Sequence, residues 1–159
     1  FNKATACPVE LLQPTHKNYT YKGGATLTDG LLGDKGFGTG RWLGFSGNDL
    51  EAVIDLKQNT DVSSVSLNTC VDKGSWIFDA RNIEVSVSAN GKSFTKVASK
   101  SLPALEEQTP DNIYTYELTF PQTTTRYVKV TATSEHNIPE WHGGKGKPAF
   151  LFVDEISIK

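Results

Sequence analysis

An alternation of apolar and polar residues with a period of two constrains the fold of this chain most strongly. The alternation runs from Ile83 to Val87, is interrupted by Asn90-Gly91, and is followed by a second β-prone run from Phe94 to Val97. Successive side chains of a strand point to opposite faces, so such runs predict strands with one buried face. Asn-Gly between two such runs predicts a β-hairpin.

The same alternation recurs along the chain, and no segment shows a sustained helical stripe. Further strands are expected around residues 50–56, 64–68, 114–120, 128–132 and 150–158. Short strands joined by Gly, Pro and Asn turns predict a single all-β domain over 1–159, an antiparallel β-sandwich or barrel. Long loops, which in compact domains are usually functional, are expected at Leu27–Gly47, Cys70–Arg81, Ser99–Asn112 and Ser134–Pro148.

Charge and motifs exclude several function classes. The net charge of −2 gives no electrostatic basis for nucleic-acid binding or for an anionic membrane. No G-x-S-x-G or H-E-x-x-H motif occurs, so we expect no catalysis in this chain. The chain contains no Met, so we expect a processed protein or one domain of a longer protein. Cys7 and Cys70 are compatible either with a disulfide or with two buried thiols.

The stretch LTDGLLGDKGFGTGRWLGF (27–45) combines glycines and acids with an aromatic pair. Asp29-Gly30 and Gly33-Asp34 provide carboxylates and the sharp turns that bring backbone carbonyls towards a calcium ion. The alternative is a tight turn in which Asp29 bonds its own backbone. In the last predicted strand, Asp154 and Glu155 are adjacent, so at least one of the two points inward and needs a partner or a metal.

Several segments in a fixed order carry a resemblance: LTDG, RWLGF, AVIDL, IEVSVSANGKSF, RYVKVTAT and FVDEISI. The chain resembles the discoidin, or coagulation factor five/eight type C, domain and its family 32 carbohydrate-binding modules. It looks most like the C-terminal domains of bacterial family 20 β-N-acetylhexosaminidases, the chitobiase-like enzymes. The resemblance implies a jelly-roll sandwich of about eight strands, an exported protein, and a glycosidase catalytic domain as partner in the same parent chain.

The resemblance also implies one structural Ca²⁺ in the Gly-rich loop. It places side-chain ligands at Asp29 and Glu155, and backbone oxygens at Thr26, Leu31 and Asp154. Where the family often has a Thr before the Trp, this chain has Gly40-Arg41. Asp34 or a glycine carbonyl is the expected substitute.

For a glycan, the resemblance implies a site on the loops at one end of the sandwich. An aromatic platform with a few fixed polar groups suits a sugar, and the residues expected to provide them are Trp76, Trp141, His142, Asp72, Lys73 and Phe45. Trp42 and Phe78 are expected in the core, and His142 either orients a hydroxyl or caps a carbonyl. Galactose-binding members often carry Arg and Asn near the places of Asp72 and Ile77. The resemblance therefore does not imply that this chain binds galactose in the way those members do.

Three functions remain open on this basis. The first is a non-catalytic module that binds an N-acetylhexosamine- or galactose-type glycan for its parent enzyme. The second is a structural domain that docks on the catalytic domain through the end carrying Trp76 and Trp141. The third is phospholipid binding, for which Lys145 and Lys147 form only a small basic cluster in an acidic chain, so we do not expect a membrane partner.

Overall fold

The computed structural model describes residues 2–33 and 41–159. The described residues form β1 (Val9–Leu11), η1 (Gly23–Thr28), β2 (Leu43–Ser46), β3 (Leu50–Val71), η2 (Lys73–Ser75), β4 (Asn82–Ser88), β5 (Thr95–Ser101), β6 (Asn112–Thr133) and β7 (Phe150–Ile158), where η denotes a 3-10 helix. The pairings between these strands are all antiparallel. The predicted all-β antiparallel class is confirmed.

Two long strands, β3 and β6, run through both layers of the sandwich. Residues 50–55 of β3 pair with 127–132 of β6, and this part is flanked by β1 on one side and by β4 and β5 on the other. Residues 60–71 of β3 pair with 112–125 of β6 and with β7, which carries β2 on its other edge. The sequence predicted each long strand as two separate ones.

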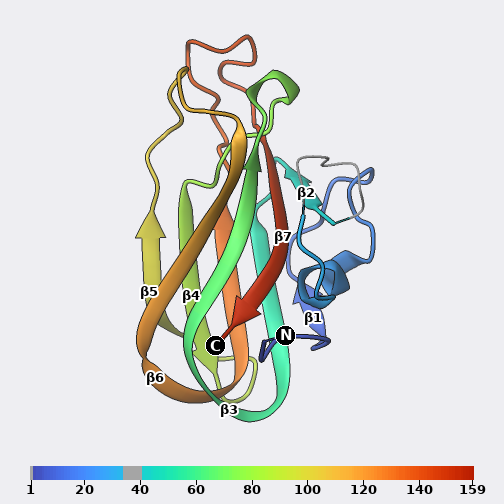
Figure 1. Cartoon of the computed structure of the whole chain (residues 1–159), viewed down its shortest axis with the longest axis vertical. Coiled ribbons are helices and arrows are strands. Elements are labelled where there is room, and N and C mark those ends of the chain that lie inside the picture. The colour runs from blue at the N-terminus through green and yellow to red at the C-terminus, as the bar shows by residue number, and fades with distance from the viewer. Residues whose placement is uncertain (1, 34–40) are drawn as a thin grey trace.

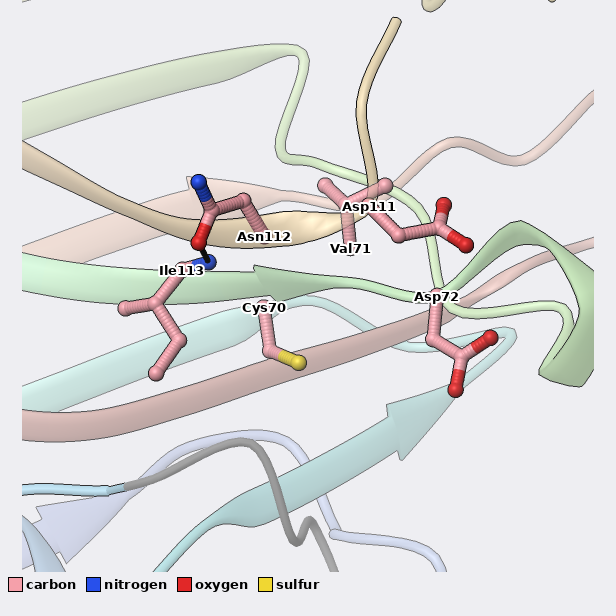
Figure 2. A pocket seen from close by; sticks show the side chains of 6 residues that line it. All are labelled: Cys70, Val71, Asp72, Asp111, Asn112 and Ile113. Atoms are coloured by element: carbon pink, nitrogen blue, oxygen red, sulfur yellow. Dashed lines mark hydrogen bonds between the residues drawn. The ribbon is translucent and has the colours of Figure 1, made fainter.

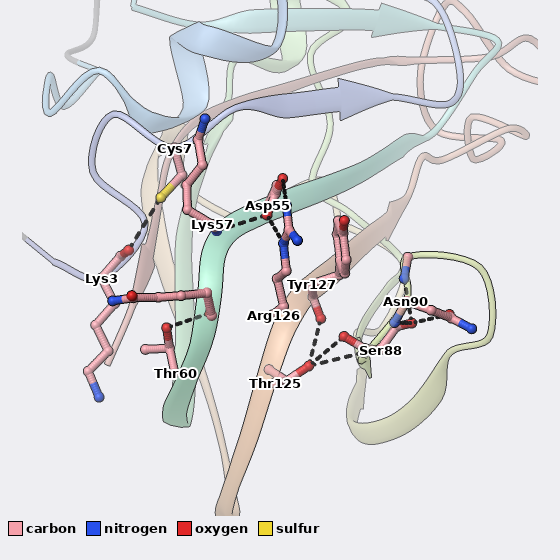
Figure 3. Close-up of polar contacts among 12 residues, drawn as sticks. Lys3, Cys7, Asp55, Lys57, Thr60, Ser88, Asn90, Thr125, Arg126 and Tyr127 are labelled. Atoms are coloured by element: carbon pink, nitrogen blue, oxygen red, sulfur yellow. Dashed lines mark hydrogen bonds and ion pairs between the residues drawn. The ribbon is translucent and has the colours of Figure 1, made fainter.

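Asp55 stabilises the bend in β3. The ladder changes register between Asp55 and Thr60, and between them Lys57 has a left-handed φ of 75°. Asp55 Oδ1 accepts the Lys57 N–H at 2.8 Å, and the carboxylate also accepts Nε and Nη2 of Arg126 at 2.9 and 3.1 Å (Figure 3). The Arg126 hydrogen bond is the main cause that lowers the pKa of Asp55. The bend of β3 is therefore tied to β6.

The predicted hairpin is confirmed, with a longer loop than two residues. β4 and β5 pair from Asn82↔Ser101 to Val87↔Thr95, and Gly91 in the connecting loop has a φ of 75°. Asn90 Oδ1 accepts the N–H groups of Lys92 and Ser93 at 2.9 and 3.0 Å. Asn90 thus holds the turn with its side chain, as Asn commonly does.

The main core lies between the two layers. Ile54, Ile83 and Val130 face it from one layer, and Leu67 and Val153 from the other. A smaller cluster on the outer side of β7 holds Trp42, Cys70, Ile77 and Phe152. Cys7 packs against the main core, whereas Cys70 belongs to this second cluster, and both thiols are free. The disulfide alternative is therefore wrong.

Three connections gather at one end of the molecule. They follow β3, β5 and β6, and in Figure 1 they form the green, gold and orange-red loops at the top. The β4–β5 loop and the bends of the two long strands lie at the other end, and the N-terminal segment with β1, η1 and β2 covers one side. We call the first end, formed by residues 72–81, 102–111 and 134–149, the loop end. Within the described ranges, no helix has the length and apolarity needed to cross a membrane.

Candidate functional site

Trp141 is a half-buried aromatic ring fixed at the loop end. The ring stacks on Phe78, with centroids 5.9 Å apart and an interplanar angle of 19°, which is an offset stack within the usual range. Phe78 is 1% exposed and forms a small core with Ile138 and Ala149, against which Trp76, Leu105 and Trp141 pack. The core position predicted for Phe78 is confirmed.

His142 joins two of the three loops of this end. Its Nε2 lies 2.7 Å from the carbonyl oxygen of Lys73, and its Nδ1 accepts the Gly144 N–H at 2.9 Å. Because a carbonyl can only accept, Nε2 carries the proton and the ring is held as one neutral tautomer. Of the two roles expected for His142, the structure shows the carbonyl cap. Both ring nitrogens are engaged, which removes His142 from the expected sugar-contacting set.

Replacing His142 by Ala is expected to lower the free energy of unfolding by about 1–3 kcal/mol, since it leaves the buried Gly144 N–H without its partner and the Lys73 carbonyl with only the Trp76 N–H. Urea denaturation of H142A measures this loss. His136→Ala is the matched control, because the His136 side chain is 47% exposed and contacts the Asp49 carboxylate near the protein surface. Equal losses in the two variants would contradict the bridging role of His142.

Trp76 is held in an uncommon backbone conformation. It ends η2 with a left-handed φ of 64°, and its N–H bonds the Lys73 carbonyl. Its own carbonyl accepts the Phe150 N–H at 2.8 Å. Lys147 Nζ lies 5.8 Å from the centre of the half-buried indole ring. The second aromatic side chain expected for a sugar is therefore also at the loop end.

A hollow of about 340 Å³ lies in the loop after β6, the loop that also carries Trp141. Its lining includes Asn137, Pro139, Glu140 and Lys145, which together provide an amide, a carboxylate, an ammonium group and an apolar ring. From the sequence, Lys145 was named only as part of a small basic cluster, and none of the other three was named. These three do not stand out there, because only the closure of the loop brings them together.

Asp72 and Lys73 have different surroundings. Lys73 Nζ bonds Asp111 at 2.8 Å and the Thr109 carbonyl, so its ammonium group already has partners. The Asp72 carboxylate lines a hollow of about 160 Å³ with Cys70, Asp111 and Ile113 (Figure 2). Among the described residues no hydrogen bond to this carboxylate is present, so of the two only Asp72 has a side chain available to a ligand.

Phe45 does not belong to the site. It is 0% exposed and packs in the main core, because β2 pairs with β7 and places Phe45 opposite Leu151. Its assignment to sugar binding is therefore wrong. Trp42 is also 0% exposed, which confirms its predicted core position.

Packing accounts for part of the glycine content of the 27–45 stretch. A Cβ on Gly33 would lie 2.2 Å from the Trp42 ring, and a Cβ on Gly44 would lie 2.4 Å from the Phe152 ring.

The two acids predicted to meet across the chain do meet. Both carboxylate oxygens of Glu155 accept the Gly30 N–H, at 3.0 and 3.2 Å, and Asp29 lies close enough to affect the titration of Glu155. Burial raises the pKa of Glu155 to about 7, and the charge of Asp29 adds to this effect. Lys22 pairs with Asp29 at 3.2 Å from a side chain that is 56% exposed.

The other residues expected to bind calcium differ in how well their positions suit that role. The buried Asp154 carboxylate accepts from Gly33 and Asn68, so only its backbone oxygen would be available to a metal, as expected. Thr26 is buried and Leu31 is 42% exposed, while Asp34 lies outside the described residues. Over residues 2–33 and 41–159 no group of three His, Cys, Asp or Glu side chains could hold a metal, so a cation here would rely on carbonyls beside Asp29 and Glu155.

The fold recurs in solved structures of low sequence identity. Chitosan-binding module 1 of a chitosanase/glucanase from Paenibacillus sp. IK-5 superposes with a TM-score of 0.62 at 16% identity, covering 100% of this chain and 98% of that chain. A Streptococcus pneumoniae fucose binding module superposes with a TM-score of 0.61 at 19% identity, covering 99% of this chain and 94% of that chain. A Ruminococcus gnavus GH29 fucosidase in complex with fucose gives 0.64 at 15% identity, covering 99% of this chain and 26% of that chain.

No curated protein sequence matches the chain. The model of the F5/8 type C domain matches residues 12–147, which is most of the chain. The structure agrees, since LTDG lies at the end of η1 and the other five segments that carried the resemblance lie in or beside β2, β3, β4, β6 and β7 of one antiparallel sandwich. The chain belongs to the F5/8 type C domain family.

Proposed function

We propose that this domain is a non-catalytic carbohydrate-binding module whose glycan site lies at the loop end. The observation that carries the proposal is Trp141, a half-buried ring held in a fixed orientation by the buried Phe78. A rigid ring on a rigid sandwich offers the apolar face of a sugar a surface with little loss of side-chain entropy. Trp76 provides a second ring on the neighbouring loop.

Polar groups for the hydroxyls of a sugar lie on the same loop as Trp141. Asn137, Glu140 and Lys145 line the hollow in this loop, and together they offer both donors and acceptors. Asp72 adds a carboxylate on the loop after β3. The printed names of the solved neighbours, chitosan-binding and fucose-binding modules, support a glycan ligand for this fold without specifying the sugar.

The test compares Trp141→Ala with Phe94→Ala by titration calorimetry against N-acetylglucosamine, chitobiose, galactose, N-acetylgalactosamine and fucose. Phe94 is a matched control because it is also a half-buried loop aromatic, in the β4–β5 loop at the opposite end. We expect the wild type and F94A to bind one sugar class alike, and W141A to bind it at least about tenfold more weakly, since stacking on an aromatic ring contributes about 1–3 kcal/mol. Unchanged binding by W141A would refute the site.

The parent protein is proposed to be an exported glycoside hydrolase, of the β-N-acetylhexosaminidase type by resemblance. Solved structures in which a similar domain covers only 26–27% of a longer chain support an accessory role beside a larger part. Such a module raises the effective concentration of its parent enzyme on the glycan.

We also propose a structural Ca²⁺ held by the carboxylates of Asp29 and Glu155. Two adjacent acids, one of them 4% exposed, fit a hard cation that prefers oxygen ligands. Thr26, Leu31 and Asp154 would contribute carbonyl oxygens. The ion would supply the positive charge that the buried Glu155 lacks and would join the loop after η1 to β7.

A further inference from the structure

A third pocket at the loop end lies between the 102–109 segment and the start of β6. It has a volume of about 230 Å³ and its lining includes Asp79, Leu102, Leu105, Glu106, Tyr114 and Tyr116. None of these residues lines the hollow in the loop after β6. The pocket is smaller than the roughly 300–1,000 Å³ of sites for drug-sized molecules, so it suits a single small ring or a short chain.

Asp79 is a buried acid without a basic partner. It is 8% exposed. Its Oδ1 accepts the Thr69 hydroxyl at 2.7 Å and the Ala80 N–H at 2.8 Å, while its Oδ2 accepts, among the described residues, the Tyr116 hydroxyl alone. A carboxylate oxygen can accept two hydrogen bonds, so Oδ2 retains one acceptor position. Burial is the main cause that raises the pKa of Asp79, and no ion pair to its carboxylate is present among the described residues.

The neighbouring cations are already paired. Arg81 bonds Glu135 through Nη1 at 2.9 Å and the Leu102 carbonyl through Nε at 3.2 Å. Lys73 bonds Asp111 and the Thr109 carbonyl. The other charged residue that lines the pocket, the exposed Glu106, is an acid. The pocket therefore carries negative charge and lacks a cation of its own among the described residues.

Two tyrosines add to the attraction for a cation. Tyr114 and Tyr116 line the pocket, and their hydroxyls are fixed by the Pro110 carbonyl and by Asp79. The face of an aromatic ring attracts an ammonium group, most strongly where water is excluded. Both ends of the 102–109 segment are anchored, Leu102 by a 2.9 Å bond to the Arg81 carbonyl and Thr109 by Lys73, so the walls are formed before a ligand arrives.

We propose that this pocket binds a small primary amine, with its ammonium group on Asp79 Oδ2 and its apolar part against the tyrosine rings and Leu105. Among glycans, the matching class is a hexosamine with a free amino group. N-acetylation removes the charge and adds bulk, so the pocket discriminates against acetylated sugars. The inference goes beyond the proposed glycan site, because it rests on different residues and does not require Trp141.

The test follows backbone amide shifts by NMR while the chain is titrated with glucosamine, N-acetylglucosamine and glucose. We expect glucosamine to shift Ala80 and residues 102–109 and to bind at least about tenfold more tightly than the other two, because hydrogen bonds to charged groups are the strong ones. Asp79→Asn, which keeps the shape and removes the charge, is expected to abolish this preference. Absence of glucosamine binding at millimolar concentration would overturn the proposal.

A second variant keeps the test decisive if D79N does not fold. Ala104 is exposed and lines the pocket, so Ala104→Lys places an ammonium group at its mouth without disturbing the core. We expect A104K to lose glucosamine and W141A to retain it. If W141A loses glucosamine while A104K retains it, the amine belongs to the loop-end glycan site and the pocket proposal is wrong, whereas the glycan proposal stands.

Discussion

Replacing Phe45 by Ala is expected to lower the free energy of unfolding by about 3–5 kcal/mol, the usual cost of removing a buried Phe ring. Phe45 is 0% exposed and lies in the main core between the layers. Its strand, β2, pairs with β7 along one edge, and Phe45 lies opposite Leu151 in this pairing, so the cavity would also weaken the contact between β2 and β7. Urea or guanidinium denaturation followed by circular dichroism measures the loss.

The control for this prediction is Phe94→Ala. Phe94 is half-buried and contacts Lys129, whose Nζ lies 4.6 Å from the ring centre, so its removal is expected to cost clearly less. F45A protein that remains folded should still bind the glycan, because the Phe45 side chain is 0% exposed and contributes no surface to a ligand. A loss of glycan binding in F45A with unchanged stability would contradict the core position.

Removing calcium is expected to lower the melting temperature by roughly 5–10 °C if the ion is present at about a hundred times its Kd. A ligand that binds only the folded state stabilises it by mass action, and here it also relieves the repulsion between Asp29 and Glu155. Thermal unfolding with calcium and with a chelator measures the shift.

Asp29→Asn should abolish the response to chelator. The amide keeps an acceptor for the Leu31 N–H, which Asp29 Oδ1 accepts at 2.9 Å, but it lacks the charge. Asp61→Asn is the matched control, since Asp61 is exposed and its carboxylate accepts the Thr124 hydroxyl, whereas Lys3 bonds its backbone carbonyl. A chelator effect that persists unchanged in D29N would place the ion elsewhere, and the absence of any effect in the wild type would leave the loop as an ordinary turn.

The period-two pattern was sufficient for the fold class and for the β4–β5 hairpin, because side-chain alternation directly reports a half-buried sheet. It did not show that β3 and β6 are continuous through both layers. The pattern breaks at the bend, and Lys57, which adopts a left-handed conformation there, is not a residue type that signals one. The tertiary bond between Asp55 and Arg126 makes this bend possible.

For the candidate glycan site, local composition identified only some of the residues at the loop end. Trp76 and Trp141 stand among polar residues and glycines, and both do lie at the loop end. Phe45 was misassigned because an aromatic residue after a Gly-rich stretch looks exposed, whereas Gly44 and Gly33 make room for packed rings. The bond of His142 to the Lys73 carbonyl and the pocket at Asp79 depend on contacts between residues 35 or more positions apart, which no local pattern contains.

The glycan site at the loop end is the central claim, and a glycan array tests it most directly. The wild-type chain, in buffer with calcium, would be screened beside the Trp76→Ala/Trp141→Ala double variant, with both shown to be folded by circular dichroism. We expect the wild type to be retained by a chemically related set of glycans and the double variant to be retained by none of them. Equal retention of both proteins, or no retention of the wild type, would contradict it.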